Sequence, residues 1–169
     1  MTTQNVLEAE QRERLKQTIE KAIINLLTEQ AARTMQESPV AKLWQALGDL
    51  LDTQQIYFAP KCGPDIPPAM GAKRLGWYDA ERVYLLSNEA LAEAKQYWRS
   101  LDETFDVKSD ALNRQLEQQG YIVERGEEKH RARKTAIQGV NTRMLHLHRA
   151  KLEQDGLTFT TQQETNNDI

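Results

Sequence analysis

The feature that most constrains the fold of this sequence is a long segment, residues 6–35, without glycine or proline. Its apolar residues recur every three or four positions, which is the spacing of one face of an α-helix. These residues are Leu15, Ile19, Ala22, Ile23, Leu26 and Leu27. Charged residues lie between them, so the segment predicts a long amphipathic helix.

A second helix is predicted immediately afterwards. Ser38 suits an N-cap and Pro39 suits the first helical turn. Apolar residues at helical spacing follow: Val40, Leu43, Trp44, Leu47, Leu50 and Leu51. Together, residues 1–54 predict a helical hairpin with an apolar core. A homodimer through the N-terminal helices is the alternative, although the apolar pattern keeps a strict heptad for only a short distance.

Residues 55–87 predict a small β element. Residues 55–59 form a short strand-like run, and residues 60–71 hold four of the five prolines, so an irregular loop is expected there. The runs 75–78 and 82–86 predict a tight β-hairpin. Gly76 inside the first of these runs indicates a bulge or the close approach of another backbone.

Residues 88–151 predict two helices followed by a β-hairpin. Ser87 or Asn88 is suited to cap the first helix and Ser109 the second, which ends before Gly120. Strand-like runs are expected at 121–124, 131–137 and 143–148. This order is typical of a winged-helix domain, in which the later helix enters the major groove and the hairpin, or wing, lies on the DNA backbone. The fold class is therefore predicted to be α+β, with a polar and disordered tail at 152–169.

The charge of the chain is unevenly distributed. The whole chain has 22 Lys and Arg against 25 Asp and Glu, a net charge of −3. Residues 108–151 alone hold 10 basic and 5 acidic residues, whereas the segments on both sides are net acidic. A polyanion responds to this local charge, so the basic segment predicts contact with DNA. A solvated basic face without a partner is the alternative.

The predicted DNA contacts belong to the second helix and the wing. Asn113 and Arg114 are expected to face outward and suit bidentate contacts with bases. Asp110 and Glu117 on the same helix would repel phosphate. The remaining candidates would contact phosphates or steady the helix start. They are Lys108, Ser109, Arg125, Lys129, Arg131, Arg133 and Lys134.

Several short runs resemble a known family. They are residues 75–79, 83–86, 105–109 and 144–147, with Leu112, Leu116, Gly120 and Tyr121 at intermediate positions. In this order they resemble the C-terminal region of primase–helicase replication proteins from plasmids, phages and genomic islands. The resemblance covers about residues 38–149. It implies a DNA-binding winged helix and a replicative helicase or primase as partner. The family's ATPase motif does not occur, because Gly71-Ala72-Lys73 does not fit Gly-x-x-x-x-Gly-Lys-Ser/Thr.

The sequence offers no catalytic constellation, so no enzymatic activity and no cofactor are expected. His146 and His148 alternate on one predicted strand, but a metal needs a third ligand, and a surface pair is expected instead. The single cysteine, Cys62, excludes an internal disulfide. Trp77, Tyr78 and Tyr84 are expected in the core rather than stacked on bases.

Nothing in the sequence predicts a membrane partner. No apolar run approaches about 18 residues, and the first residues lack the pattern of a secretory signal. We therefore expect a cytoplasmic protein. The leading hypothesis is a DNA-binding accessory protein or domain of a mobile-element replication system, acting on duplex or partly unwound DNA. A protein-interaction or dimerisation module without direct DNA contact is the alternative.

Overall fold

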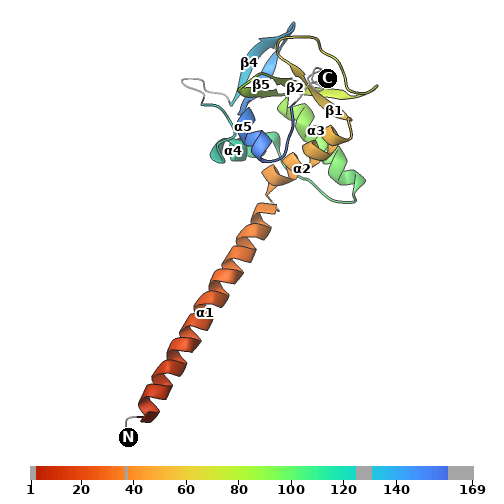
Figure 1. Ribbon diagram of the computed structural model, residues 1–169. Coiled ribbons are helices and arrows are strands. Elements are labelled where there is room, and N and C mark those ends of the chain that lie inside the picture. Colours follow the sequence, from red (N-terminus) through yellow and green to blue (C-terminus); the bar gives the residue numbers. More distant parts are fainter. Residues whose placement is uncertain (1–2, 37, 125–130, 160–169) are drawn as a thin grey trace, which may run out of the picture. The chain divides into compact units, whose positions relative to one another are not determined.

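A computed structural model describes residues 3–36, 38–124 and 131–159 (Figure 1). The chain divides into two compact units, Met1–Ser38 and Pro39–Ile169. The first contains α1 (Thr3–Gln36). The second contains α2 (Pro39–Asp52), β1 (Ile56–Pro60), β2 (Lys73–Tyr78), β3 (Arg82–Leu85), α3 (Ser87–Ser100), α4 (Ser109–Gln118), β4 (Ala132–Ile137), β5 (Val140–His148) and α5 (Arg149–Gln154). The predicted α+β class is confirmed.

The long N-terminal helix is present, but its apolar residues are not in the core of the chain. All side chains from 12 to 30 are exposed, with Leu15 at 61% and Leu26 at 59% of full exposure. α2 instead buries its apolar face in the second unit, through Leu43 and Leu47 among others. The predicted helical hairpin, with a core shared by residues 1–54, is therefore not confirmed. The physical reason is that the rest of the second unit already covers the apolar face of α2.

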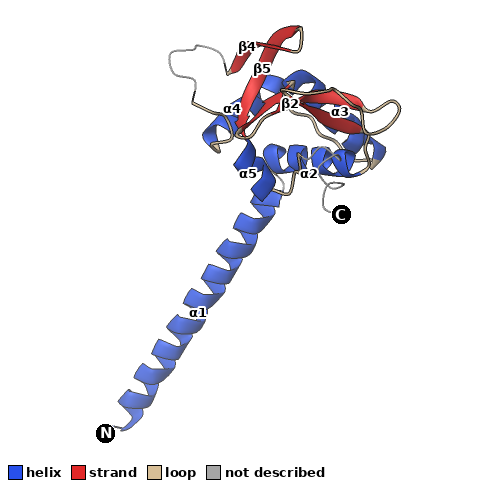
Figure 2. Ribbon diagram, turned by 45° about the horizontal axis from the view of Figure 1, so that its top comes forward, coloured by secondary structure: helices blue, strands red, loops and turns tan. Residues whose placement is uncertain are grey.

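The second unit is built around one five-stranded sheet of order β1-β2-β3-β5-β4. Figure 2 shows the strands in red and the helices in blue. β1 pairs with β2 in parallel, and all other neighbours are antiparallel. The predicted hairpins at β2–β3 and β4–β5 are both present. The predicted strand at 121–124 is not formed, and this segment makes only an isolated bridge between Ile122 and Leu147.

Side chains alternate across the sheet and fill two cores. On one face Leu75, Val83 and Leu145 pack with the apolar sides of the helices, and α4 packs on α2 and α3. On the other face Trp77 and Tyr84 form a smaller cluster, with exposures of 0% and 3%. The prediction that these two aromatic residues belong to the core is confirmed.

At Gly76 the backbone of β3 leaves no room for a side chain on β2. A Cβ atom at this position would lie 1.9 Å from the carbonyl oxygen of Tyr84, and its φ is +158°. The register of β1 on β2 shifts between Tyr57 and Phe58 at the same level. The predicted bulge and close approach at Gly76 are confirmed.

The predicted helix caps are wrong at both α3 and α4. The N-cap residues are Leu86 and Lys108, and neither makes a side-chain capping hydrogen bond. The Ser109 hydroxyl instead donates to Oδ1 of Asn88 at 3.0 Å. This bond ties the start of α4 to α3, so the polar residues at the two helix starts hold one another rather than the free backbone N–H groups.

The polar tail begins later than predicted. Leu152 lies in α5, and Leu157 and Phe159 are buried at 2% and 4% exposure. The Phe159 ring packs edge-on against Phe58 at 5.2 Å between centroids. Burial of these apolar side chains holds residues 152–159 on the second unit, although the other residues of this segment are polar or glycine. Residues 160–169 of the predicted tail lie outside the described residues.

Candidate nucleic-acid interface

Arg131 joins α4 to the start of β4. Its Nε donates to Oε2 of Glu117 at 2.6 Å, and its Nη1 lies 3.6 Å from Oδ1 of Asp110. Arg114 pairs with the same Asp110 at 3.3 Å, one helical turn away. The two carboxylates expected to repel phosphate are therefore both paired with arginines. Arg131 links helix and hairpin instead of standing free, and its side chain is only 26% exposed.

The outer surface of α4 differs in part from the prediction. Leu112 and Leu116 anchor the helix in the core, with 2% and 0% exposure. Arg114 and Lys108 are exposed. Asn113 is half-buried, and its Oδ1 atom is buried with no hydrogen-bond partner among the described residues. The predicted outward orientation of Asn113 is therefore wrong, because its neighbours cover the amide oxygen.

Arg133 also has a role within the fold. Its Nη2 donates to the carbonyl oxygen of Val123 at 2.8 Å and to that of Glu124. These bonds hold the segment after α4 against the edge of the sheet. The predicted phosphate contact at Arg133 would have to compete with them. Arg125 and Lys129, also predicted contacts, lie outside the described residues.

Lys134 and Arg143 form a cationic pair across the hairpin. They lie directly opposite each other in β4 and β5, and both are exposed. Arg143 donates from Nη1 to the carbonyl oxygen of Ala132 at 3.4 Å, a neutral acceptor that does not offset its positive charge. Like charges directly opposite on two strands destabilise the pair. We refer to Lys134 and Arg143 as the wing pair.

Lys134 was among the predicted phosphate contacts, whereas Arg143 was not. The signal was available in the turn at Gln138-Gly139, where Ile137 faces Val140. A two-residue turn fixes the register of the whole hairpin, so it also places residue 134 opposite residue 143. The charges in the sequence do not identify the pair unless the strand register is also known.

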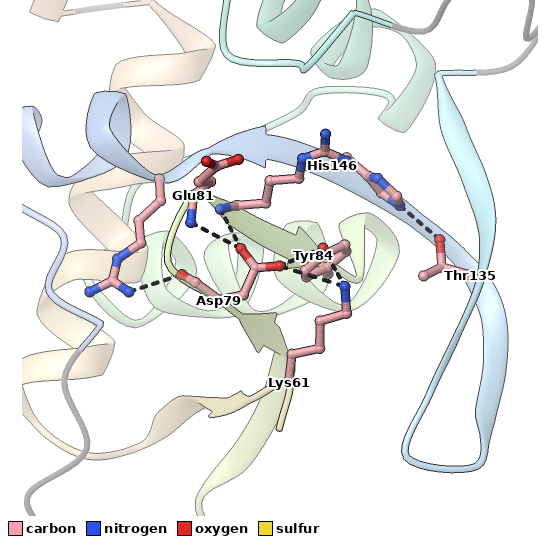
Figure 3. Close-up of polar contacts among 8 residues, drawn as sticks. Lys61, Asp79, Glu81, Tyr84, Thr135 and His146 are labelled. Atoms are coloured by element: carbon pink, nitrogen blue, oxygen red, sulfur yellow. Dashed lines mark hydrogen bonds and ion pairs between the residues drawn. The ribbon is translucent and has the colours of Figure 1, made fainter. Parts of the chain in front are cut away.

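His146 is buried beside Tyr84 (Figure 3), at 4.8 Å between ring centroids. His148, in contrast, is exposed. The predicted surface pair is therefore wrong for His146. Its Nε2 lies 2.7 Å from the Thr135 hydroxyl, and its Nδ1 has no hydrogen-bond partner among the described residues. The pKa of His146 is lowered to about 4. Burial is the largest cause, and the positive charge of Arg133 is the second largest.

Lys61, Asp79 and Tyr84 form a second polar group on this face (Figure 3). The Tyr84 hydroxyl donates to Asp79 at 2.7 Å and accepts from Lys61 at 2.9 Å. The hydrogen bond to Tyr84 raises the pKa of Lys61. Burial acts to raise the pKa of Asp79, but hydrogen bonds from Tyr84 and from backbone N–H groups outweigh it and leave this pKa lowered.

This second group serves the fold. Oδ1 of Asp79 accepts from the backbone N–H groups of Glu81 and Arg82 at 3.0 and 2.8 Å, which closes the β2–β3 turn. Lys61 then fastens the start of the proline-rich loop to that turn, with its Nζ 3.6 Å from Asp79. The three side chains therefore satisfy one another within the protein.

Two features are absent from the described residues. No group of three or more His, Cys, Asp or Glu side chains in them is placed to hold a metal ion. Among the helices of the same ranges, none combines the length and the apolar character needed to cross a bilayer. A scan against protein-family models matches no family, and a search of curated proteins finds no match.

Proposed function

We propose that the protein binds DNA, without catalysis, through the β4–β5 hairpin and α4. The binding would place a mobile-element replication system containing a helicase or primase on duplex or partly unwound DNA. The order α2, β3, α3, α4, β4, β5, in which β1 and β2 are inserted between α2 and β3, supports a winged-helix arrangement, as does the sheet order β3-β5-β4. In that arrangement α4 is the recognition helix and β4–β5 is the wing.

The observation that carries the proposal is the wing pair. Two exposed cations face each other on an antiparallel ladder, at a cost to the hairpin. An anionic partner that lies across both side chains would convert this repulsion into attraction. A DNA phosphate carries the required charge, and two cations on one hairpin suit the regular row of phosphates along a backbone.

Arg114 would contribute from α4. Its present partner, Asp110, also lies near Arg131, so Asp110 stays paired if Arg114 turns toward a base or a phosphate. Lys108, exposed at the helix start, would reach the flanking phosphate. The arrangement would therefore add DNA contacts without leaving a carboxylate of α4 unpaired.

The test is fluorescence anisotropy with a random duplex, titrated with salt. Lys134→Glu and Arg143→Glu together should weaken binding at least about tenfold and lower the salt slope by about 0.9 for each lost phosphate contact. The matched control is Lys95→Glu with Arg99→Glu, which makes the same change of net charge on α3. If the wing variant and the control bind equally well, the proposal is wrong.

A single variant separates binding from folding. Lys134→Glu places a carboxylate opposite Arg143 and should stabilise the hairpin by about 0.2–1 kcal/mol. A loss of DNA binding in this variant cannot then be attributed to unfolding, which urea denaturation verifies.

One observation in the second unit favours the alternative, a protein-interaction module. The loop at 61–72 exposes Ile66 and Met70 to solvent, and apolar side chains at an exposed loop suit a protein contact. Under this alternative, the anisotropy of labelled DNA would not respond to Lys134→Glu.

A further inference from the structure

The apolar face of α1 is exposed to solvent along the described residues 12–30. α1 is a unit of its own, and neither core cluster of the second unit includes a residue from it. Leu15, Ile19 and Leu26 are 61%, 48% and 59% exposed. An isolated helix is marginally stable in water, and burial of its apolar face removes that face from water. A partner that covers this face would therefore stabilise the helix.

The spacing of the face is that of a coiled-coil seam. Steps of three and four residues alternate along six positions, as they do between a and d positions of a heptad. These positions are Arg12, Leu15, Ile19, Ala22, Leu26 and Glu29. We call them the α1 seam. Its middle is apolar, one end carries a positive charge and the other end a negative charge.

The charges at its ends select both the partner and the orientation. In an antiparallel pair of identical helices, Arg12 of one copy meets Glu29 of the other, and Leu15 meets Leu26. Ile19 then meets Ala22, so that a large side chain lies opposite a small one at the centre. In a parallel pair in register, Arg12 would meet Arg12 and Glu29 would meet Glu29, which places like charges at both ends.

We propose that α1 binds α1 of a second copy of this chain as an antiparallel two-helix coiled coil along the α1 seam. A second copy is the occupant that the seam specifies, because its sequence is complementary to itself about a two-fold axis between residues 20 and 21. Ile23 and Leu27, exposed beside the seam, would widen the buried surface. This interface is independent of the wing pair and of DNA.

Sedimentation equilibrium of the full chain over a wide range of protein concentration tests the proposal. The wild type should be a reversible dimer. Arg12→Glu creates two Glu–Glu contacts and Glu29→Arg creates two Arg–Arg contacts, so each variant should weaken the dimer by roughly tenfold or more. The double variant restores opposite charges and should dimerise like the wild type.

The matched control is Lys21→Glu, a charge reversal at an exposed position of α1 outside the seam, which should leave the dimer intact. A wild type that is monomeric at every concentration would overturn the proposal, and so would a trimer or tetramer. A parallel pair is distinguished because Arg12→Glu would only exchange Arg–Arg for Glu–Glu contacts and change little. That result, or a double variant that fails to recover, excludes the antiparallel seam.

Discussion

At the scale of single residues, the protonation state of His146 follows from its neighbours. The Thr135 hydroxyl donates to the carbonyl oxygen of Arg133 at 3.1 Å, so its oxygen accepts from Nε2–H of His146. The other ring nitrogen, Nδ1, is buried without a partner among the described residues. A proton added there would find no acceptor and would lie near cationic side chains.

This arrangement predicts a loss of stability in acid. The folded pKa of about 4 is below the ordinary value of 6.5, so the unfolded chain binds a proton first as the pH falls. The His146 contribution is complete above about pH 7 and is lost between about pH 6.5 and 4, by up to about 3 kcal/mol. Urea denaturation as a function of pH should show a smaller loss in His146→Gln. The exposed His148 provides the control, and a His148→Gln variant that removes the same pH dependence would contradict the assignment.

Gly76 gives a second prediction at this scale. Gly76→Ala would force a methyl group against the Tyr84 carbonyl and should reduce the free energy of unfolding by about 3 kcal/mol or more. At Gly48 in α2 an added methyl group would have no atom within 4 Å, so Gly48→Ala should instead stabilise by about 0.5–1 kcal/mol. Thermal unfolding of both variants tests the contrast. If Gly76→Ala and Gly48→Ala changed the stability equally, the close approach of the Tyr84 carbonyl to Gly76 would be disproved.

Residue roles were the hardest feature to predict from sequence. The positions of Arg131 and Arg133 in a basic segment indicated phosphate contacts, yet both arginines have partners within the fold. The partners are a carboxylate on another element and backbone carbonyls, and neither leaves a signature in a charge pattern. Lys134 is exposed and remains a candidate phosphate contact.

At the scale of elements, helices and hairpins could be predicted because their signals are local. Periodicity placed the long helices, and the turn residues placed both hairpins. The parallel pairing of β1 with β2 could not be predicted, since it depends on a backbone contact that no local pattern encodes. The segment after α5 was misjudged for a related reason. Of its described residues, 155–159, Leu157 and Phe159 are buried, and the residues beside them in sequence are mostly polar.

The burial of Phe159 yields a prediction for this segment. Its ring contacts Phe58, and its carbonyl oxygen accepts from Nη2 of Arg149 at 3.2 Å. Phe159→Ala should destabilise the second unit by about 3 kcal/mol. Thr158→Ala, at an exposed neighbour, should change stability by less than about 0.5 kcal/mol. Chemical denaturation compares the two, and a Phe159→Ala variant as stable as Thr158→Ala would mean that the segment does not support the core.

At the scale of the whole molecule, the order of elements was predicted better than their association. The sequence order of helix, helix and hairpin in the second unit agrees with the observed order of α3, α4 and β4–β5. The exposure of the apolar side chains of α1 was not predicted, because an apolar face gives the same sequence pattern whether it is buried or exposed. The apolar pattern alone does not specify a partner for α1, so the proposed partner depends on the charges at the ends of the α1 seam.

The parallel pairing of β1 and β2 has a consequence for how this chain can change in length. The segment 61–72 must return from the end of β1 to the start of β2, and its 12 residues are close to the minimum for a parallel crossover. A deletion there would pull β1 from the sheet edge. An insertion beside the fully exposed Met70 would cost little, because loop entropy grows slowly with length. Related chains should therefore lengthen at this loop, and a peptide tag or fluorophore-binding sequence placed there would report on the protein from a site remote from the α1 seam in sequence.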